Sequence, residues 1–354
     1  MFEFGGLLAL DRACPTTRDS ADFAANSVRL GHYEPSLRQS SRDKALVRRA
    51  VIDIGTNSVK LLVAEVASHA VLPLWEGSHQ TRLGEGFYQD HRLRPGAIAR
   101  TAEAVAQFAS KAAQLGASPV RAIGTSAVRD ASNQEEFLDQ VRSTSGVDVE
   151  IISGEQEADW VYAGVRSDPT LAEGTLLILD VGGGSTEIIL GQGAQQTYCH
   201  SFALGTVRLM ERFPHADPPS EQDWTRCRNA IDQFLDKEVK PSLGPHLQSS
   251  DRESRLVATG GTAAILASIT LGLTHFDRER IERTVLSRQN VQHLQATLWT
   301  APLAKRRQFP GLPPNRADVI LFGVAIFEVL MGSLGFEQLR ASTRGLRFGA
   351  IAAP

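Results

Sequence analysis

The chain has 354 residues, a net charge of −3 and a hydrophobic share of 42%. These values are typical of a globular protein of about two domains, and they exclude a mainly disordered, collagen-like or coiled-coil chain. The near-neutral charge predicts neither a nucleic-acid partner nor a membrane surface.

The cysteines and the apolar stretches exclude further classes. Cys14, Cys199 and Cys227 lie far apart and form no CxxC pair, so the sequence indicates neither a zinc site nor a disulfide framework. We expect reduced thiols in a cytoplasmic protein. The most apolar stretch, residues 319–331, falls short of the roughly 20 apolar residues that a bilayer crossing requires, so we expect no membrane span.

The first half of the chain predicts strands and helices in alternation. Residues 1–48 show no sustained period and are expected to form a loose leader. Apolar and β-branched runs predict strands at 50–54, 59–66 and 71–75, and helical spacing predicts a helix at 95–115 that ends at Gly116. The elements expected next are a strand at 120–123, a helix at 133–141, a strand at 149–152 and a helix at 155–165.

The second half begins in the same way as the first. We expect strands at 176–181, 186–190 and 256–258, and helices at 207–213, 221–239 and 317–331, with an Ala-rich helix after residues 260–262. Strands and helices that alternate in this way predict an α/β protein.

A repeated turn is the most informative feature of the sequence. The segments are DIGTNS from Asp53 and DVGGGS from Asp180, each with Gly two residues and Ser five residues after the Asp. Each copy follows an apolar strand and precedes another strand. A duplicated domain explains the two copies, and two similar halves that face each other would bring both turns to one cleft, where ligands commonly bind.

The composition of the turn favours phosphate chemistry. Glycine lets the backbone approach a ligand closely, and successive N–H groups form a nest for an anion. The Asp carboxylate repels phosphate but can hold Mg²⁺, usually through water. The sequence contains no GxxxxGK[ST] motif and no GxGxxG motif followed by a helix, so a P-loop and a Rossmann site are both excluded.

The chain resembles the exopolyphosphatase and guanosine pentaphosphate phosphatase (Ppx/GppA) family, which belongs to the actin, sugar kinase and heat-shock ATPase clan. The resemblance is carried by VIDIGTNSVKLLVAEV, AIGTSAVRDASNQEEFL, IISGEQEA, LILDVGGGSTEIILG, ATGGTAAILA and RADVILFGVAIFEVL, in this order along the chain. We expect the short, two-domain form of the family, without the helical C-terminal part that contributes to long-chain polyphosphate binding in the longer members.

The resemblance implies a duplicated actin-like, ribonuclease H-like α/β fold with an inter-domain cleft. Its expected parts are domain I at 49–170, domain II at 171–343 and a C-terminal helix at 344–354 that packs back on domain I. It also implies Mg²⁺-dependent hydrolysis of a terminal phosphoanhydride bond of polyphosphate or guanosine pentaphosphate, and a possible homodimer.

The resemblance also assigns roles to residues. Glu157 and Glu187 are the expected catalytic residues, with Glu157 orienting or deprotonating the attacking water. The expected Mg²⁺ ligands are Asp53, Asp180 and Glu187. The resemblance and the composition of the two turns together indicate a set of phosphate-binding residues. These are Gly55, Asn57, Ser58, Lys60, Arg129, Gly183, Gly184, Ser185, Gly260, Gly261 and Thr262.

The residues taken alone leave alternatives open. An acid such as Glu157 is common in the first turn of a helix because it interacts favourably with the macrodipole. Arg129 could cap a loop or pair with Asp130. Glu187 is less ambiguous, because an acid on a strand needs a cation or water as a partner.

Other functions remain open as well. One is an ATP-binding kinase-like protein or a conformational ATPase of the same clan, with an adenosine pocket beside residues 260–262. Another is a non-enzymatic sensor of polyphosphate or nucleotide.

Overall fold

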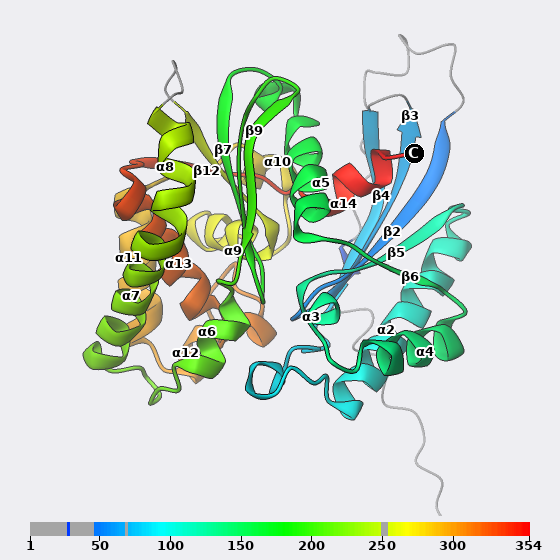
Figure 1. The fold of residues 1–354 in the computed structure, drawn as a ribbon, viewed down its shortest axis with the longest axis horizontal. Coiled ribbons are helices and arrows are strands. Elements are labelled where there is room, and N and C mark those ends of the chain that lie inside the picture. The colour runs from blue at the N-terminus through cyan, green and yellow to red at the C-terminus, as the bar shows by residue number, and fades with distance from the viewer. Residues whose placement is uncertain (1–26, 29–45, 68–69, 249–253) are drawn as a thin grey trace, which may run out of the picture.

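The computed structural model describes residues 27–28, 46–67, 70–248 and 254–354, so most of the predicted leader at 1–48 lies outside the described residues. Figure 1 shows two α/β lobes side by side, which we call domain I and domain II. Strand β2 (Val47–Ile54) begins within the range predicted for the leader, because Val47 already pairs with Val66 of the next strand.

Domain I is built on a six-stranded sheet of order β1-β4-β3-β2-β5-β6. Its other strands are β1 (Ser27–Val28), β3 (Val59–Ala67), β4 (Ala70–His79), β5 (Val120–Gly124) and β6 (Val149–Ile151). Strands β2, β3 and β4 are antiparallel and follow each other through short connections, whereas β5 and β6 run parallel to β2. Parallel pairing requires a crossover, and helices supply it here.

Domain II repeats this arrangement. Its sheet has the order β11-β12-β10-β7-β8-β9, with β7 (Thr175–Val181), β8 (Thr186–Gln192), β9 (Gln195–Phe202), β10 (Arg255–Thr259), β11 (Val285–Ser287) and β12 (Gln338–Ala341). Strands β9-β8-β7-β10-β12 stand in the same order as β4-β3-β2-β5-β6. The predicted duplicated α/β fold is therefore confirmed.

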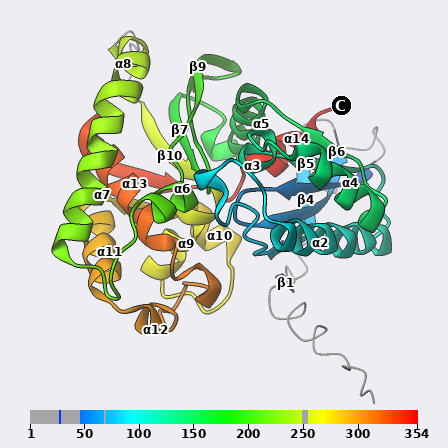
Figure 2. The ribbon, with the colours of Figure 1, turned by 60° about the horizontal axis from the view of Figure 1, so that its bottom comes forward.

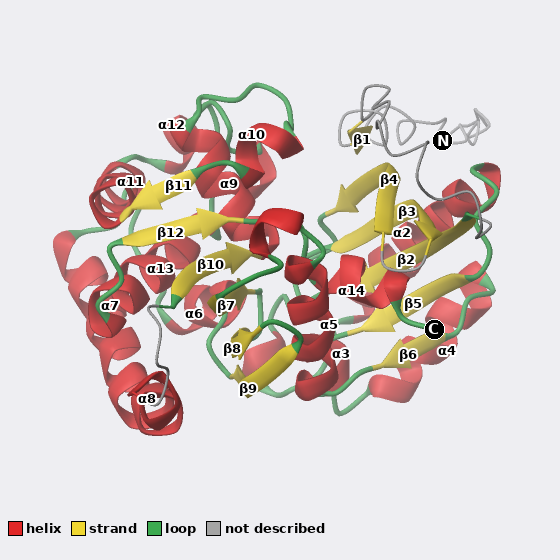
Figure 3. Cartoon of the chain, turned by 90° about the horizontal axis from the view of Figure 1, so that it is seen from above, coloured by secondary structure: helices red, strands yellow, loops and turns green. Residues whose placement is uncertain are grey.

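Helices cover both sheets (Figure 3). Domain I carries η2 (Phe87–Gln89), α2 (Pro95–Gln114), α3 (Ser126–Arg129) and α4 (Gln134–Ser145). The short η3 (Pro169–Leu171) precedes β7. Domain II carries α6 (Thr206–Arg212), α7 (Glu221–Phe234), η4 (Leu235–Val239), α8 (Lys240–Gln248), α9 (Gly260–Thr270), α10 (Arg278–Glu282), α11 (Arg288–Thr300), α12 (Leu303–Arg306), η5 (Pro314–Arg316) and α13 (Ile320–Leu334).

Helix α13 is the apolar helix that the sequence predicts at 317–331, and it packs against α6, α7 and α11. All of its residues from Ile320 to Met331 are buried, as expected of a helix that is apolar on every side. Within the described part of the chain, no helix has both the length and the apolar character needed to cross a bilayer.

Two helices lie between the sheets: α5 (Gly154–Arg166) and α14 (Leu346–Ala352) (Figures 1 and 3). Helix α14 packs on β2 and β3 of domain I, whereas α5 packs on β8 and β9 of domain II although it falls in the range predicted for domain I. One continuous core joins both helices to the inner faces of both sheets.

The two central helices cross at glycines. A Cβ atom on Gly164 would overlap the carbonyl oxygen of Gly345, and a Cβ atom on Gly349 would overlap the carbonyl oxygen of Trp160. Because the backbones touch directly, there is no room at the crossing for any side chain.

Candidate active site

The two repeated turns have the same backbone geometry. The Gly55 N–H donates to the Ser58 carbonyl at 3.0 Å, and the Gly182 N–H donates to the Ser185 carbonyl at 2.9 Å. In the flanking strands Asp53 lies opposite Lys60, and Asp180 lies opposite Glu187. Lys60 and Glu187 therefore hold equivalent positions in the two halves and carry opposite charges.

The turns and the start of α5 enclose a small cavity of about 90 Å³ between the domains. The predicted site residues that line it are Asp53, Gly55, Asn57, Ser58, Lys60, Glu157, Asp180, Gly183, Gly184, Ser185, Glu187, Gly261 and Thr262. Gly260 lines a larger neighbouring cavity of about 890 Å³ instead. The two cavities share Asp53, Lys60, Asp180, Gly261, Arg316 and Leu346, so they form one cleft with a narrow and a wide part.

Glu157 lies in the first turn of α5 and points into the narrow part. Ser153 caps this helix by accepting a hydrogen bond from the Gln156 N–H at 3.1 Å. Arg129 donates through Nη1 to Glu157 Oε2 at 3.1 Å and to the Ile152 carbonyl at 3.1 Å. Burial and the nearby Glu187 raise the pKa of Glu157 well above its ordinary value, although Arg129 opposes the shift.

Arg129 does not line either part of the cleft, so the structure places it behind Glu157. Its Nε also lies 3.7 Å from Asp130 Oδ1, which is the pairing that the sequence left as an alternative. Direct contact between Arg129 and phosphate stays a prediction.

Glu187 is a buried carboxylate, and Asp180 on the adjacent strand is a half-buried one. Burial and the charge of Asp180 raise the pKa of Glu187 to about 7, while Ser201 opposes the shift by donating to Glu187 Oε1 at 2.7 Å. Burial also raises the pKa of Asp180 to about 6, against the attraction of Lys60. Among the described residues, four carboxylates but only Lys60 and Arg316 as cations line the narrow part, so its negative charge is in excess when all of these groups are ionised.

Lys60 faces this acidic group from domain I. Its Nζ lies 4.0 Å from Asp53 Oδ2, and burial lowers its pKa although Asp53 favours the charged form. Arg316 lines both parts of the cleft, and burial lowers its pKa to about 10. A cationic ligand such as a metal, or a proton, would relieve the excess negative charge.

The carboxylates of the site fit an Mg²⁺ ion that is held by a few protein oxygens and completes its shell with water and phosphate. Among the described residues, no group of three or more His, Cys, Asp or Glu side chains is arranged to enclose a metal ion. Proteins, however, commonly hold Mg²⁺ through one or two carboxylates, with water and phosphate oxygens completing its shell. Asp53, Asp180 and Glu187 offer carboxylate oxygens of this kind at the cavity wall.

Close packing explains one predicted glycine. Gly260 begins α9 with a φ of +86°, and a Cβ atom there would overlap Asp180 Oδ1. A larger residue would therefore displace the carboxylate of Asp180.

The segment between β4 and α2 was not among the predicted parts of the site, and it reaches across to domain II beside α6 (Figure 2). Glu211 of α6 accepts hydrogen bonds from the N–H groups of Gly86 at 2.6 Å and Tyr88 at 3.2 Å. Arg208 lies over the Tyr88 ring at 4.2 Å and donates to the Gly184 carbonyl at 3.0 Å. The GEG sequence at 84–86 was the available signal for a tight turn at this contact between the domains.

Comparison with known proteins supports the same reading. The family model described as the Ppx/GppA phosphatase family matches residues 62–353. Exopolyphosphatase 2 of Mycobacterium tuberculosis is 31% identical over 320 residues, which cover 86% of this chain and 98% of that protein. A guanosine-5'-triphosphate,3'-diphosphate pyrophosphatase of Aeromonas hydrophila is 28% identical over 302 residues, which cover 85% of this chain and 58% of that protein.

A solved structure agrees with the fold. The crystal structure of an exopolyphosphatase from Cytophaga hutchinsonii superposes with a TM-score of 0.77 at 27% identity, and covers 85% of this chain and 96% of that chain.

Proposed function

The chain belongs to the Ppx/GppA phosphatase family, and we propose that it hydrolyses the terminal phosphoanhydride bond of polyphosphate, guanosine pentaphosphate or both. The observation that carries this proposal is the group of four carboxylates between two Gly–Ser turns. One relative is named an exopolyphosphatase and another a guanosine pentaphosphate pyrophosphatase, so their names support both substrates.

Phosphoryl transfer to water depends mainly on positioning and charge neutralisation. The N–H groups of the two turns and the Lys60 ammonium would bind the oxygens of the terminal phosphate. Glu157 would orient the attacking water and accept its proton, and its raised pKa makes it a stronger base when it is ionised. Arg129 would hold the Glu157 carboxylate in place through their hydrogen bond.

Asp53, Asp180 and Glu187 would hold Mg²⁺, partly through water. The ion would neutralise phosphate charge in the site. The carboxylates themselves must be ionised to bind it, so binding should be coupled to their pKa values.

The stability of the metal-free protein should fall as the pH rises. The folded pKa values of Glu187 and Asp180, about 7 and about 6, lie above their ordinary values of 4.5 and 3.8. The folded state therefore binds more protons than the unfolded chain in this range, so the free energy of unfolding decreases between about pH 4 and about pH 7. Thermal unfolding in EDTA over this range measures the effect.

Matched variants and Mg²⁺ test the cause. Glu187→Gln and Asp180→Asn should each flatten the pH dependence, and Mg²⁺ should raise the unfolding temperature more at high pH than at low pH. Slopes that match the wild type in both variants would contradict the assignment to these carboxylates.

The function itself is tested by phosphate release with Mg²⁺ from polyphosphate, guanosine pentaphosphate and ATP. We expect release from at least one of the first two, and loss of that release with EDTA. The apolar residues Ile265, Phe276 and Leu312 line the wide part beside Gly260 and Gly261, which favours an ATP-binding relative of the clan as the second candidate. Turnover of ATP alone would establish that candidate instead.

A further inference from the structure

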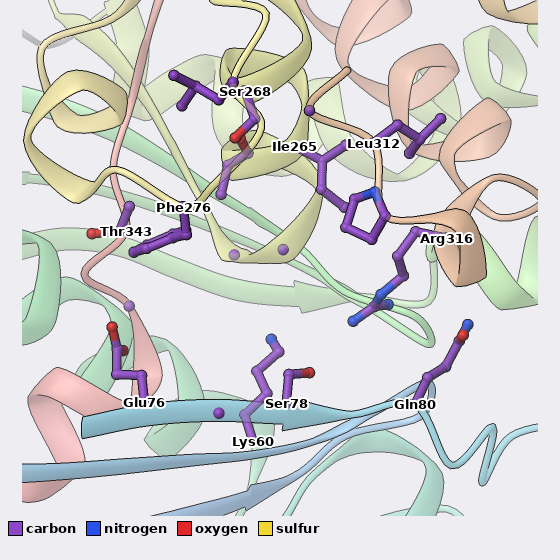
Figure 4. Close-up of a pocket in the computed structure, with 18 of the residues that line it drawn as sticks. Lys60, Glu76, Ser78, Gln80, Ile265, Ser268, Phe276, Leu312, Arg316 and Thr343 are labelled. Carbon is purple, nitrogen blue, oxygen red and sulfur yellow. The ribbon is translucent and has the colours of Figure 1, made fainter. Parts of the chain in front are cut away.

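A row of polar side chains on β4 forms one wall of the wide part of the cleft. The row consists of every second residue at the end of β4 and just beyond it: Glu76, Ser78 and Gln80. Ser78 lies opposite Lys60 of β3 (Figure 4). Gln80 donates to Asn57 Oδ1 at 3.1 Å, so the row begins at the first phosphate-binding turn. At the rise of an extended chain, Glu76 lies about 13 Å along the row from Gln80.

Domain II supplies the opposite wall, and it is mostly apolar. Ile265, Phe276 and Leu312 face the β4 row across the cleft (Figure 4). The Arg and Lys side chains that line the wide part are Lys60, Arg316 and Arg347. A phosphate chain that extends from the first turn would therefore run along the polar row toward Glu76.

Glu76 joins both domains at the far end of this row. Its Oε2 accepts a hydrogen bond from Arg278 of α10 in domain II, and its Oε1 lies 3.3 Å from Arg347 Nη1. The Glu76 side chain is only 10% exposed. Arg278 also contacts Glu282 at 3.2 Å, and Arg344 contacts Glu282 at 3.2 Å, so the pair belongs to a larger ionic network.

We propose that Glu76 is a specificity-determining residue that restricts the cleft to short phosphate chains; this inference rests on the proposed function. The carboxylate that a chain meets at Glu76 is already paired with Arg278 and Arg347, and its Oε1 is buried. The same carboxylate neutralises Arg347, the cation that lines the cleft at this end, and ties β4 to α10. A cation neutralised where only a longer ligand would reach it lowers the affinity for that ligand alone, which is a source of specificity.

The test compares Glu76→Gln with the wild type on tripolyphosphate and on a long polyphosphate. Gln removes the charge but keeps an oxygen that can accept from Arg278, so the contact between the domains is retained. We expect the KM for long polyphosphate to fall about tenfold or more, because Arg347 loses its acidic partner and keeps only the Leu61 carbonyl, to which Nη1 donates at 3.0 Å, so its charge is left for phosphate. The kcat and KM for tripolyphosphate should remain within about twofold, since the terminal-phosphate site is untouched.

Glu282→Gln is the matched control. It removes the same charge from the same ionic network, but Glu282 does not line the cleft. Its ratio of KM values for long and short chains should equal that of the wild type. An equal change for both substrates in Glu76→Gln, no change at all, or the same change in Glu282→Gln would overturn the proposal.

Binding measurements separate this proposal from the proposed function. Calorimetry measures the binding of tripolyphosphate and of long polyphosphate to proteins that carry Glu157→Gln, with and without Glu76→Gln. The measurement does not depend on turnover. A wild type that hydrolyses no phosphoanhydride refutes the function, whereas the binding ratio still decides the role of Glu76.

A second variant guards against misfolding of Glu76→Gln. Arg278 does not line the cleft, so Arg278→Gln removes no cation from its wall and leaves Glu76 with less counter-charge. Long polyphosphate should then bind more weakly and tripolyphosphate equally well. Tighter or unchanged binding of the long chain would contradict the proposal.

Discussion

Replacing Glu157 by Gln should lower phosphate release about 10²–10⁴-fold and leave the protein folded. Gln has nearly the same shape as Glu, but its amide cannot accept a proton from the attacking water. Its contact with Arg129 is also weaker, because the amide carries no charge. Substrate binding should change far less than kcat, because the turns that hold phosphate are separate from this side chain. Phosphate release under single-turnover conditions and a thermal unfolding curve measure the two effects.

Glu155→Gln is the control for this prediction. Glu155 lies in the same first turn of α5 but is exposed, and it lines neither part of the cleft. The Glu155→Gln variant removes the same charge near the N-terminus of α5. It should therefore show any change in activity that comes only from the interaction of that charge with the helix macrodipole. A Glu157→Gln protein as active as Glu155→Gln would refute the role of Glu157.

Gly349→Ala should destabilise the protein by about 3 kcal/mol, the upper part of the range for overpacked cores. The new methyl group would meet the Trp160 carbonyl, which is backbone and cannot rotate away. The central helices would have to separate, and α5 carries Glu157 at its start, so phosphate release should fall as well. Chemical unfolding and activity together measure the result.

Gly244→Ala makes the same change where nothing is crowded. Gly244 lies in α8, and a Cβ atom there would have no neighbour within 4 Å. We expect unchanged or slightly higher stability, by up to about 1 kcal/mol, because Ala favours the helix over Gly. Equal unfolding midpoints for the two variants would show that the crossing does not depend on backbone contact.

Local patterns in the sequence were sufficient to predict the core of the fold. The apolar strands before and after each turn, β2, β3, β7 and β8, are confirmed, because buried strands show as continuous apolar runs. Strand β9 was missed because its side chains are mostly half-buried or exposed and polar. Strand β12 and helix α11 were also missed; β12 is short, and its place is fixed by pairing with β10 and β11 rather than by its own composition.

The sequence allowed prediction of those parts of the candidate site whose residues lie together in one continuous segment. The two turns are contiguous in sequence, so their glycines, Ser58 and Ser185 could be identified directly. The pairing of Arg129 with Glu157 joins two helices, and the contact of Glu211 with Gly86 joins two domains. Such contacts depend on tertiary packing, which no local pattern contains. Glu76 could not be identified either, because its partners Arg278 and Arg347 are distant in the chain.

The opposite charges at Lys60 and Glu187 make the surroundings of the two duplicated turns different from each other. Two identical copies would form a symmetric cradle in which a phosphate could bind either way round. With Lys60 on the wall shared with the wide part, and with Glu157 and Glu187 only in the narrow part, the two ends of the bound group are distinct. Under the proposed function the water attacks from the narrow end and the leaving group departs toward the wide end. Under the same proposed function, the charge inversion between the two copies and the position of Glu157 together orient the scissile bond.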